Sequence, residues 1–292
     1  MAHHPECTIG EDPIKNLALT ALVSCLFLLA PPLMAAEPCT ACAGIEGFVP
    51  PDAINPDLYL MVGKARRSDK ARSVEIQEAR GVVRTGLKPA FIEDGTCPGI
   101  DTEGWAINYT GKRPWPAQHK GVDIPQPRGT PIRAIADGTV IGIFENDGNR
   151  KGIEIALRHT PEQTGLPFWT YSQYTHLSEM PALAIGDAVR MGAEIGKTGN
   201  SGKMGRNIRR DALHFAVLFS AAPSWSNDGR VFVPADGFFM DPIAFYRQEG
   251  PYVSAELAEL PSSEKAVPVA YLKTDGTPVP AGAKRIWPYP CK

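Results

Sequence analysis

Two strand-like segments of the sequence carry histidines beside residues that could share a metal ion. In QHKGVDIP, His119 and Asp123 stand four positions apart. Because side chains alternate along a β-strand, the sequence predicts that both lie on one face, with Gly121 between them leaving space for an ion. In ALHFAV, the apolar Leu213 and Phe215 predict that His214 projects from the opposite face. Imidazole and carboxylate groups are common ligands of zinc.

A third histidine stands in YTHL, where the alternation places His176 on the same face as Tyr174 and turns its two neighbours away. Two imidazoles and a carboxylate form a frequent ligand set of catalytic zinc, which leaves the fourth tetrahedral position to water. Each histidine taken alone is better explained as a polar residue on a half-exposed strand, and His-x-x-x-Asp pairs are common by chance. The interpretation as a zinc site therefore depends on the three histidines and Asp123 taken together.

The order and spacing of several segments resemble the M23 family of zinc metallopeptidases, the lysostaphin- or LytM-type endopeptidases. The resemblance covers about residues 115–246. It is carried by HKGVDIPQPRGTPIRAIADGTVIGI, YTHLS, AIGDAVRMGAEIGKTGNSG and LHF, and by the closing MDPIAFY.

The resemblance implies a mainly β protein, an antiparallel β-sheet LytM-like peptidase domain with a groove. It assigns Zn²⁺ to His119, Asp123 and His214, and a catalytic role to His176. The implied substrates are peptide bonds of bacterial peptidoglycan, in stem-peptide crosslinks or bridges. His159 receives no catalytic role, because an exposed histidine at a strand end explains it equally well.

One position departs from the family pattern, in which the third motif reads His-x-His. Here it reads Ala212-Leu213-His214, so an imidazole is missing from the predicted metal-facing side. One hypothesis keeps the enzyme active, with Arg210 either stabilising the oxyanion or remaining a solvated rim charge. The other is a degenerate domain that binds the cell wall or regulates another wall hydrolase. The intact ligand positions favour a hydrolase.

The distribution of apolar runs and turn residues along the chain predicts which elements position these residues. Between about residues 104 and 246, short apolar runs alternate with turns, and Asp-Gly pairs at 137, 147, 228 and 236 indicate hairpins. Helices are expected only in the flanking segments, at 63–82, mostly exposed, and at Ser254–Leu260. The predicted organisation is a signal peptide at 1–36, an N-terminal extension at 37–103, a peptidase domain at 104–248 and a C-terminal extension at 249–292.

The first segment and the cysteines point to export. An apolar run over 17–36 that ends in small residues predicts a cleaved signal peptide, and hence a periplasmic or secreted protein without a stable membrane span after cleavage. The mature chain would keep Cys39, Cys42, Cys97 and Cys291, an even number that predicts two disulfides among three pairings. A redox Cys-x-x-Cys lacks the expected βαβ surroundings, and a zinc ribbon would need a second such pair.

The charge balance of the chain excludes some classes of binding partner. The formal net charge is −2 among 292 residues, which gives no electrostatic footprint for nucleic acid or anionic lipid. The segment AIGDAVRMGAEIG also resembles part of biotinyl- or lipoyl-type carrier domains, but Lys197 and Lys203 do not stand in the context of a modified lysine. The expected partners are peptidoglycan peptides and a regulatory protein.

Overall fold

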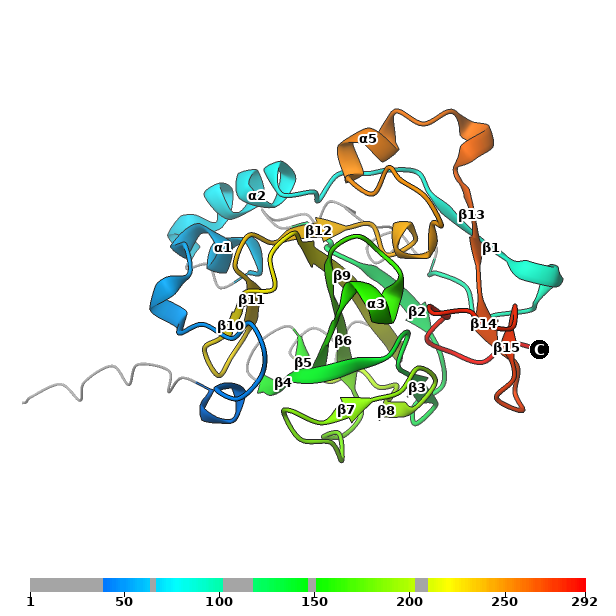
Figure 1. The fold of residues 1–292 in the computed structure, drawn as a ribbon, viewed down its shortest axis with the longest axis horizontal. Coiled ribbons are helices and arrows are strands. Elements are labelled where there is room, and N and C mark those ends of the chain that lie inside the picture. Colours follow the sequence, from blue (N-terminus) through cyan, green and yellow to red (C-terminus); the bar gives the residue numbers. More distant parts are fainter. Residues whose placement is uncertain (1–38, 64–66, 102–117, 147–150, 203–209) are drawn as a thin grey trace, which may run out of the picture. The chain divides into compact units, whose positions relative to one another are not determined.

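A computed structural model describes residues 39–63, 67–101, 118–146, 151–202 and 210–292 (Figure 1). The predicted signal peptide and the start of the predicted peptidase domain lie outside these residues. The described residues belong to one compact unit, Ala36–Lys292. They are mainly β, with antiparallel strands in the principal sheet, which confirms the predicted fold class. Among them, no helix is long and apolar enough to cross a membrane.

The principal sheet has seven strands, and each pairs antiparallel with its neighbours in the order β12-β9-β6-β5-β4-β7. The seventh strand, β2, pairs with β9 on the edge that β12 also uses. The bounds are β2 Val122–Pro125, β4 Gly138–Asn146, β5 Gly152–His159, β6 Trp169–Leu177, β7 Ala188–Val189, β9 Ala212–Ser220 and β12 Phe238–Met240.

Aromatic and β-branched residues form the long strands of this sheet, as their propensity favours. One face is apolar around the site, because Tyr174 of β6 lies opposite Phe215 of β9 and opposite Ile155 of β5. All three side chains are buried, and the rings of Tyr174 and Phe215 have centroids 5.6 Å apart. The strands therefore turn alternate residues toward the core, and their remaining side chains point to the other face.

The described residues also form four two-stranded sheets. One of them joins the two predicted extensions, because β1 runs parallel to β13 with Lys88 opposite Ala266 (Figure 1). The bounds are β1 Lys88–Phe91, β3 Pro131–Arg133, β8 Glu194–Lys197, β10 Trp225–Asn227, β11 Phe232–Pro234, β13 Ala266–Val269, β14 Tyr271–Leu272 and β15 Pro278–Val279. The pairs are β1–β13, β3–β8, β10–β11 and β14–β15.

The helices are short. They are α1 Pro56–Met61, α2 Lys70–Ala79, α3 Pro161–Thr164 and α5 Ser254–Ala258. The first begins where Asn55 accepts a hydrogen bond from the Asp57 amide, a side-chain cap at a helix start. α2 covers only part of the predicted helix at 63–82, of which 64–66 lie outside the described residues. α3 lies inside the predicted peptidase domain, where no helix was expected.

The described residues form two disulfides, Cys39–Cys42 and Cys97–Cys291. The second joins the N-terminal extension to the C-terminal tail, and backbone hydrogen bonds between Thr96 and Lys292 flank it. The Trp287 indole N–H donates to the Pro98 carbonyl in the same region. The expectation of two disulfides is confirmed, and one of the three pairings is now selected.

Candidate metal site

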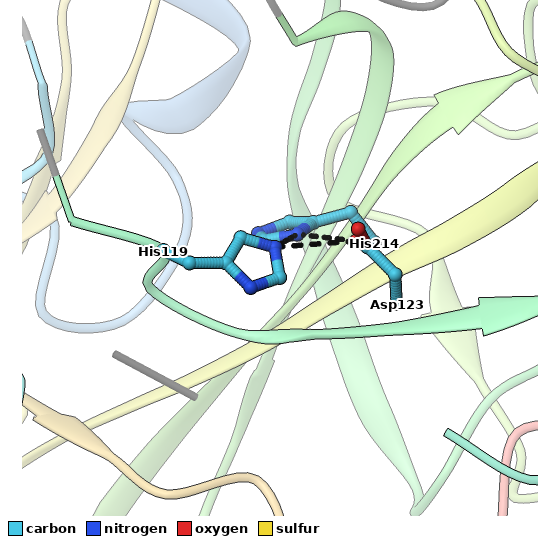
Figure 2. Close-up of side chains that lie close together, drawn as sticks. All are labelled: His119, Asp123 and His214. Carbon is cyan, nitrogen blue, oxygen red and sulfur yellow. Dashed lines mark hydrogen bonds and ion pairs between the residues drawn. The ribbon is translucent and has the colours of Figure 1, made fainter. Parts of the chain in front are cut away.

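Three side chains from separate parts of the sequence meet in one cluster (Figure 2). Nε2 of His119 lies 3.0 Å from Nδ1 of His214 and 3.3 Å from Oδ1 of Asp123. Nδ1 of His214 lies 2.9 Å from the same Asp123 oxygen. The structure thus brings together the three residues that the sequence predicts as metal ligands; their role as ligands stays a prediction.

The spacing of these three atoms fits a tetrahedral zinc ion. Ligand atoms about 2.0–2.1 Å from such an ion lie about 3.3 Å from one another, and the three distances are close to this value. The donor set is two imidazole nitrogens and one carboxylate oxygen, which zinc accepts readily. Within the described part of the chain, His119, Asp123 and His214 form the one group of this kind.

Strand pairing explains how two of the three residues meet. Asp123 in β2 lies directly opposite His214 in β9, so their side chains leave the sheet on the same face. His119 reaches them differently from the prediction, because β2 begins only at Val122 and His119 lies in the segment before it. The expectation of a strand through 119–123 is therefore wrong, although the side chains still converge.

Gly121 allows two segments of the backbone to pack closely, a role that the sequence did not predict. A Cβ atom at this position would lie 2.3 Å from the Phe215 carbonyl oxygen and 3.0 Å from the Ala216 Cβ. The absence of a side chain thus lets the segment before β2 approach β9 closely. This approach places His119 beside His214.

The cluster is buried and its acid is charged. His119 and Asp123 are both buried, and His214 is partly buried. Burial alone would raise the pKa of the Asp123 carboxyl, but His119 and His214 beside it outweigh burial and hold this pKa well below its usual range. A carboxylate that stays ionised near neutral pH is in the form that binds a cation.

His176 reaches the neighbourhood of the cluster through a β-bulge. The β5–β6 register shifts between Ile153 and Glu154, so that Leu177 and Thr175 take consecutive partners and His176 is the extra residue. Its φ angle is 66°, in the left-handed region that is uncommon for a residue with a side chain. Strict alternation would turn His176 away from the face of His214, and the bulge re-aims it.

The result is a third imidazole near the predicted ligands. The ring centroids of His176 and His214 lie 6.1 Å apart, with the two planes at 72°. Nδ1 of His176 lies 2.9 Å from the Ser201 carbonyl oxygen. The expectation that His176 and Tyr174 share a face is therefore wrong, because the bulge turns His176 toward His214. The catalytic role of His176 remains a prediction.

A charged group on the same face was missed from the sequence. Glu154 of β5 lies opposite Thr175 of β6, which in turn lies opposite His214, so this row crosses the sheet. Glu154 is fully buried and accepts a hydrogen bond from Gln173 at 2.7 Å, and Lys151 lies 3.4 Å away. A single acid in the otherwise apolar run GIEIAL is the signal that could have found it.

Arg210 has a partner that the sequence did not indicate. Its guanidinium donates two hydrogen bonds to the Asp101 carboxylate, from Nη2 at 2.8 Å and from Nε at 3.3 Å. The Asp101 amide in turn donates to the Asp123 carbonyl oxygen at 2.7 Å. Arg210 therefore links Asp101 to the strand of a predicted ligand, while half of its own side chain stays exposed to solvent.

His159 lies away from the cluster and is buried, not exposed as expected. In β5 it falls on the face opposite to Glu154 when the register is counted from Ile155. Its Nδ1 lies 2.7 Å from the Asp137 carbonyl oxygen and its Nε2 lies 2.8 Å from the Ser172 hydroxyl. These contacts explain His159 as a structural residue.

Comparison with known families agrees with the sequence patterns. Residues 117–224 match the sequence model of the family described as Peptidase family M23. The matched segment includes His119, Asp123, His176 and His214. The resemblance to M23 peptidases is therefore confirmed for this part of the chain.

Several solved structures are similar to parts of this chain. The catalytic domain of the antimicrobial peptidase lysostaphin from Staphylococcus simulans is 28% identical, covers 38% of this chain and 75% of its own, and has a TM-score of 0.29. A histidine-for-alanine mutant of the catalytic domain of the prophage-encoded M23 protein EnpA from Enterococcus faecalis is 22% identical, with coverage of 51% and 95% and a TM-score of 0.33.

A zinc-containing peptidase from Vibrio cholerae is 22% identical, with coverage of 48% of this chain and 37% of its own and a TM-score of 0.31. All three TM-scores are low. The fold of this chain is therefore defined by its own strand pairing.

Proposed function

Because residues 117–224 match peptidase family M23, we propose that this protein is a zinc-dependent endopeptidase that hydrolyses peptide bonds in bacterial peptidoglycan. The observation that supports this proposal most directly is the cluster of His119, Asp123 and His214, whose ligand atoms all lie within 4.8 Å of one another. A buried, three-ligand set that leaves a fourth position open is typical of catalytic rather than structural zinc sites.

The residues of the cluster have distinct parts in the proposed reaction. His119, His214 and the ionised Asp123 would hold the metal. Zinc, when bound in such a site, acts as a Lewis acid toward a carbonyl oxygen and lowers the pKa of water. His176 would exchange a proton with the attacking water or with the leaving amine.

The proposed place of action is the periplasm or the exterior of the cell, where peptidoglycan crosslinks are found. Two disulfides in the described residues support this proposal, because disulfides persist in oxidising compartments. The segment that would direct export, 1–36, lies outside the described residues.

Ala212 supports a second candidate function. It stands two residues before His214 on the same strand face, where the family pattern has a histidine. Loss of one acid–base group costs about 10²–10⁴-fold in rate, so a domain of this kind could instead bind the wall or regulate another wall hydrolase.

The deciding experiment measures the release of peptidoglycan fragments from purified sacculi by the zinc-loaded protein, with His119→Ala as the inactive control. We expect release by the wild type and none by the variant. A folded, zinc-loaded wild type that releases no more than His119→Ala would overturn the endopeptidase proposal and favour the binding role.

Zinc content tests the ligand set separately from activity. Asp123→Ala should bind zinc at least about 100-fold more weakly, since even changes beyond the direct ligands cost about 10–100-fold. The matched control is Glu154→Gln, which alters a buried acid on the same face about 9–10 Å away, two strand spacings from His214. Full zinc content in Asp123→Ala after dialysis would contradict the assignment.

A further inference from the structure

The imidazole of His176 is held by a segment that enters the site from β8. This segment, Thr198–Gly202, pairs with the end of β6 through a bridge between Leu177 and Thr198. The Ala212 amide donates to the Gly199 carbonyl oxygen, which fixes the segment to the start of β9. Thr198–Gly202 is therefore attached to both strands that carry histidines of the site.

Ser201 makes the contact with the ring. Its backbone carbonyl oxygen lies 2.9 Å from Nδ1 of His176. A carbonyl oxygen can only accept a hydrogen bond, so Nδ1 must carry the proton. In a neutral imidazole the other nitrogen, Nε2, then carries the lone pair and is the basic atom.

The hydroxyl of Ser201 fixes the position of this carbonyl. The Ile153 amide donates to Oγ of Ser201 at 2.9 Å, at the point of the β5–β6 register shift. The His176 amide donates to the Lys151 carbonyl oxygen at 3.1 Å, two residues earlier on the same segment. Backbone and ring of His176 are thus both tied to one short stretch, Lys151–Ile153.

Close packing leaves little freedom for this arrangement. Gly152 has a φ angle of 68°, and a Cβ atom there would lie 2.3 Å from the Ser201 carbonyl carbon and 2.4 Å from the Gly202 amide nitrogen. A side chain at Gly152 would therefore push Ser201 away from Ile153. Gly186 has a φ angle of 98° but no heavy atom within 4 Å of its added Cβ, so it offers a matched control for backbone strain alone.

We propose that Ser201 is a positioning residue for His176: its hydroxyl fixes the Thr198–Gly202 segment on Ile153, and its carbonyl selects the tautomer whose basic nitrogen is Nε2. The part of this inference that assigns proton transfer to His176 rests on the proposed function. In that reaction a fixed Nε2 lone pair accepts a proton from water without first changing tautomer.

The first test observes the tautomer directly. The ring nitrogens of the zinc-loaded protein are recorded by ¹⁵N nuclear magnetic resonance, and the signals of His176 are assigned by their loss in His176→Ala. We expect a protonated Nδ1 and an unprotonated Nε2 in the wild type, averaged tautomers in Ser201→Ala, and the wild-type pattern again in Ser201→Thr. An unchanged pattern in Ser201→Ala overturns the inference.

The second test uses kinetics on sacculi. Ser201→Ala should lower kcat about tenfold with KM changed less than about twofold and with full zinc content, because the affected group acts in the chemical step. Ser201→Thr should restore kcat. Gly152→Ala should lower kcat at least as much, whereas Gly186→Ala should retain the wild-type value.

The two tests separate failure of the inference from failure of the proposed function. A wild type without activity removes the endopeptidase proposal, and the tautomer comparison still decides whether Ser201 orients His176. In an active enzyme, a wild-type kcat in Ser201→Ala, or equal losses in the two glycine variants, shows that Ser201 does not act through His176.

Discussion

Ala212 and His214 occupy alternate positions of β9 and therefore face the same side of the sheet. His214 lies opposite Asp123, and Ala212 lies opposite Pro125 at the end of the same pairing. The position is buried, at 2% exposure. A larger side chain there would be directed along the same face as the predicted ligands. The consequence of the missing imidazole can therefore be tested at one residue.

Restoring a histidine at this position should raise activity. We expect Ala212→His to increase kcat on sacculi about tenfold or more, because a single acid–base group contributes about 10²–10⁴-fold. Ala212→Gln is the control of similar size, and both variants share an overpacking cost of about 1–3 kcal/mol. Equal rates in the two variants would argue against a vacant acid–base position.

Residue types and spacing predicted the chemistry of the site better than its geometry. The imidazole and carboxylate set was evident from the sequence, and simple alternation placed Asp123 and His214 correctly on one face. Alternation failed for His119, which lies before β2, and for His176, which lies in a bulge. Both failures come from irregular backbone that period-two reasoning does not contain.

At the scale of elements, the Asp-Gly pairs were only partly informative. Asp228-Gly229 does connect the antiparallel pair β10 and β11. Asp236-Gly237 lies between β11 and β12, which do not pair, because β12 joins β9 instead. Asp137-Gly138 lies at the start of β4 without forming a hairpin to β3, which pairs with β8. The pair at 147 lies outside the described residues. Of the three described pairs, only Asp228-Gly229 thus forms a hairpin, and strands distant in the sequence are the partners at the other two.

β5 ends at a histidine whose protonation would disturb the sheet. Burial, the largest influence, lowers the pKa of His159 from 6.5 to about 4, although the Asp137 carbonyl acts in the opposite direction. The unfolded chain therefore takes up a proton as the pH falls below about 6.5, while the native state stays neutral until about pH 4. Native stability is lost progressively over this window.

His159→Gln should remove this pH dependence, since glutamine cannot take up the proton. We expect the free energy of unfolding of the wild type, measured by urea denaturation relative to the variant, to fall by up to about 3 kcal/mol between about pH 7 and about pH 4. Other titrating groups are common to both proteins and cancel in the difference. Parallel stability profiles for the two proteins would contradict the pKa direction.

Across the whole described unit, both predicted extensions contact the elements that carry the candidate metal site. Asp101 of the N-terminal extension pairs with Arg210 and with the backbone of Asp123. In the C-terminal extension, the Tyr289 hydroxyl lies 2.7 Å from the Thr198 hydroxyl, at the start of the segment that holds His176. Composition predicted two extensions but gave no means to predict these contacts, because they join residues far apart in the sequence.

The Cys97–Cys291 disulfide ties these two extensions together over 194 residues, whereas Cys39–Cys42 spans only three. A crosslink restricts the unfolded chain more when it closes a longer loop. Replacing both Cys97 and Cys291 by alanine should therefore lower the free energy of unfolding by about 3–5 kcal/mol, against about 1–2 kcal/mol for Cys39→Ala with Cys42→Ala. Urea denaturation of the two double variants under oxidising conditions compares them. Equal losses would contradict the prediction that loop length determines the stabilisation. Contacts of the tail, such as Tyr289 with Thr198, would then hold the C-terminal segment in place without the disulfide.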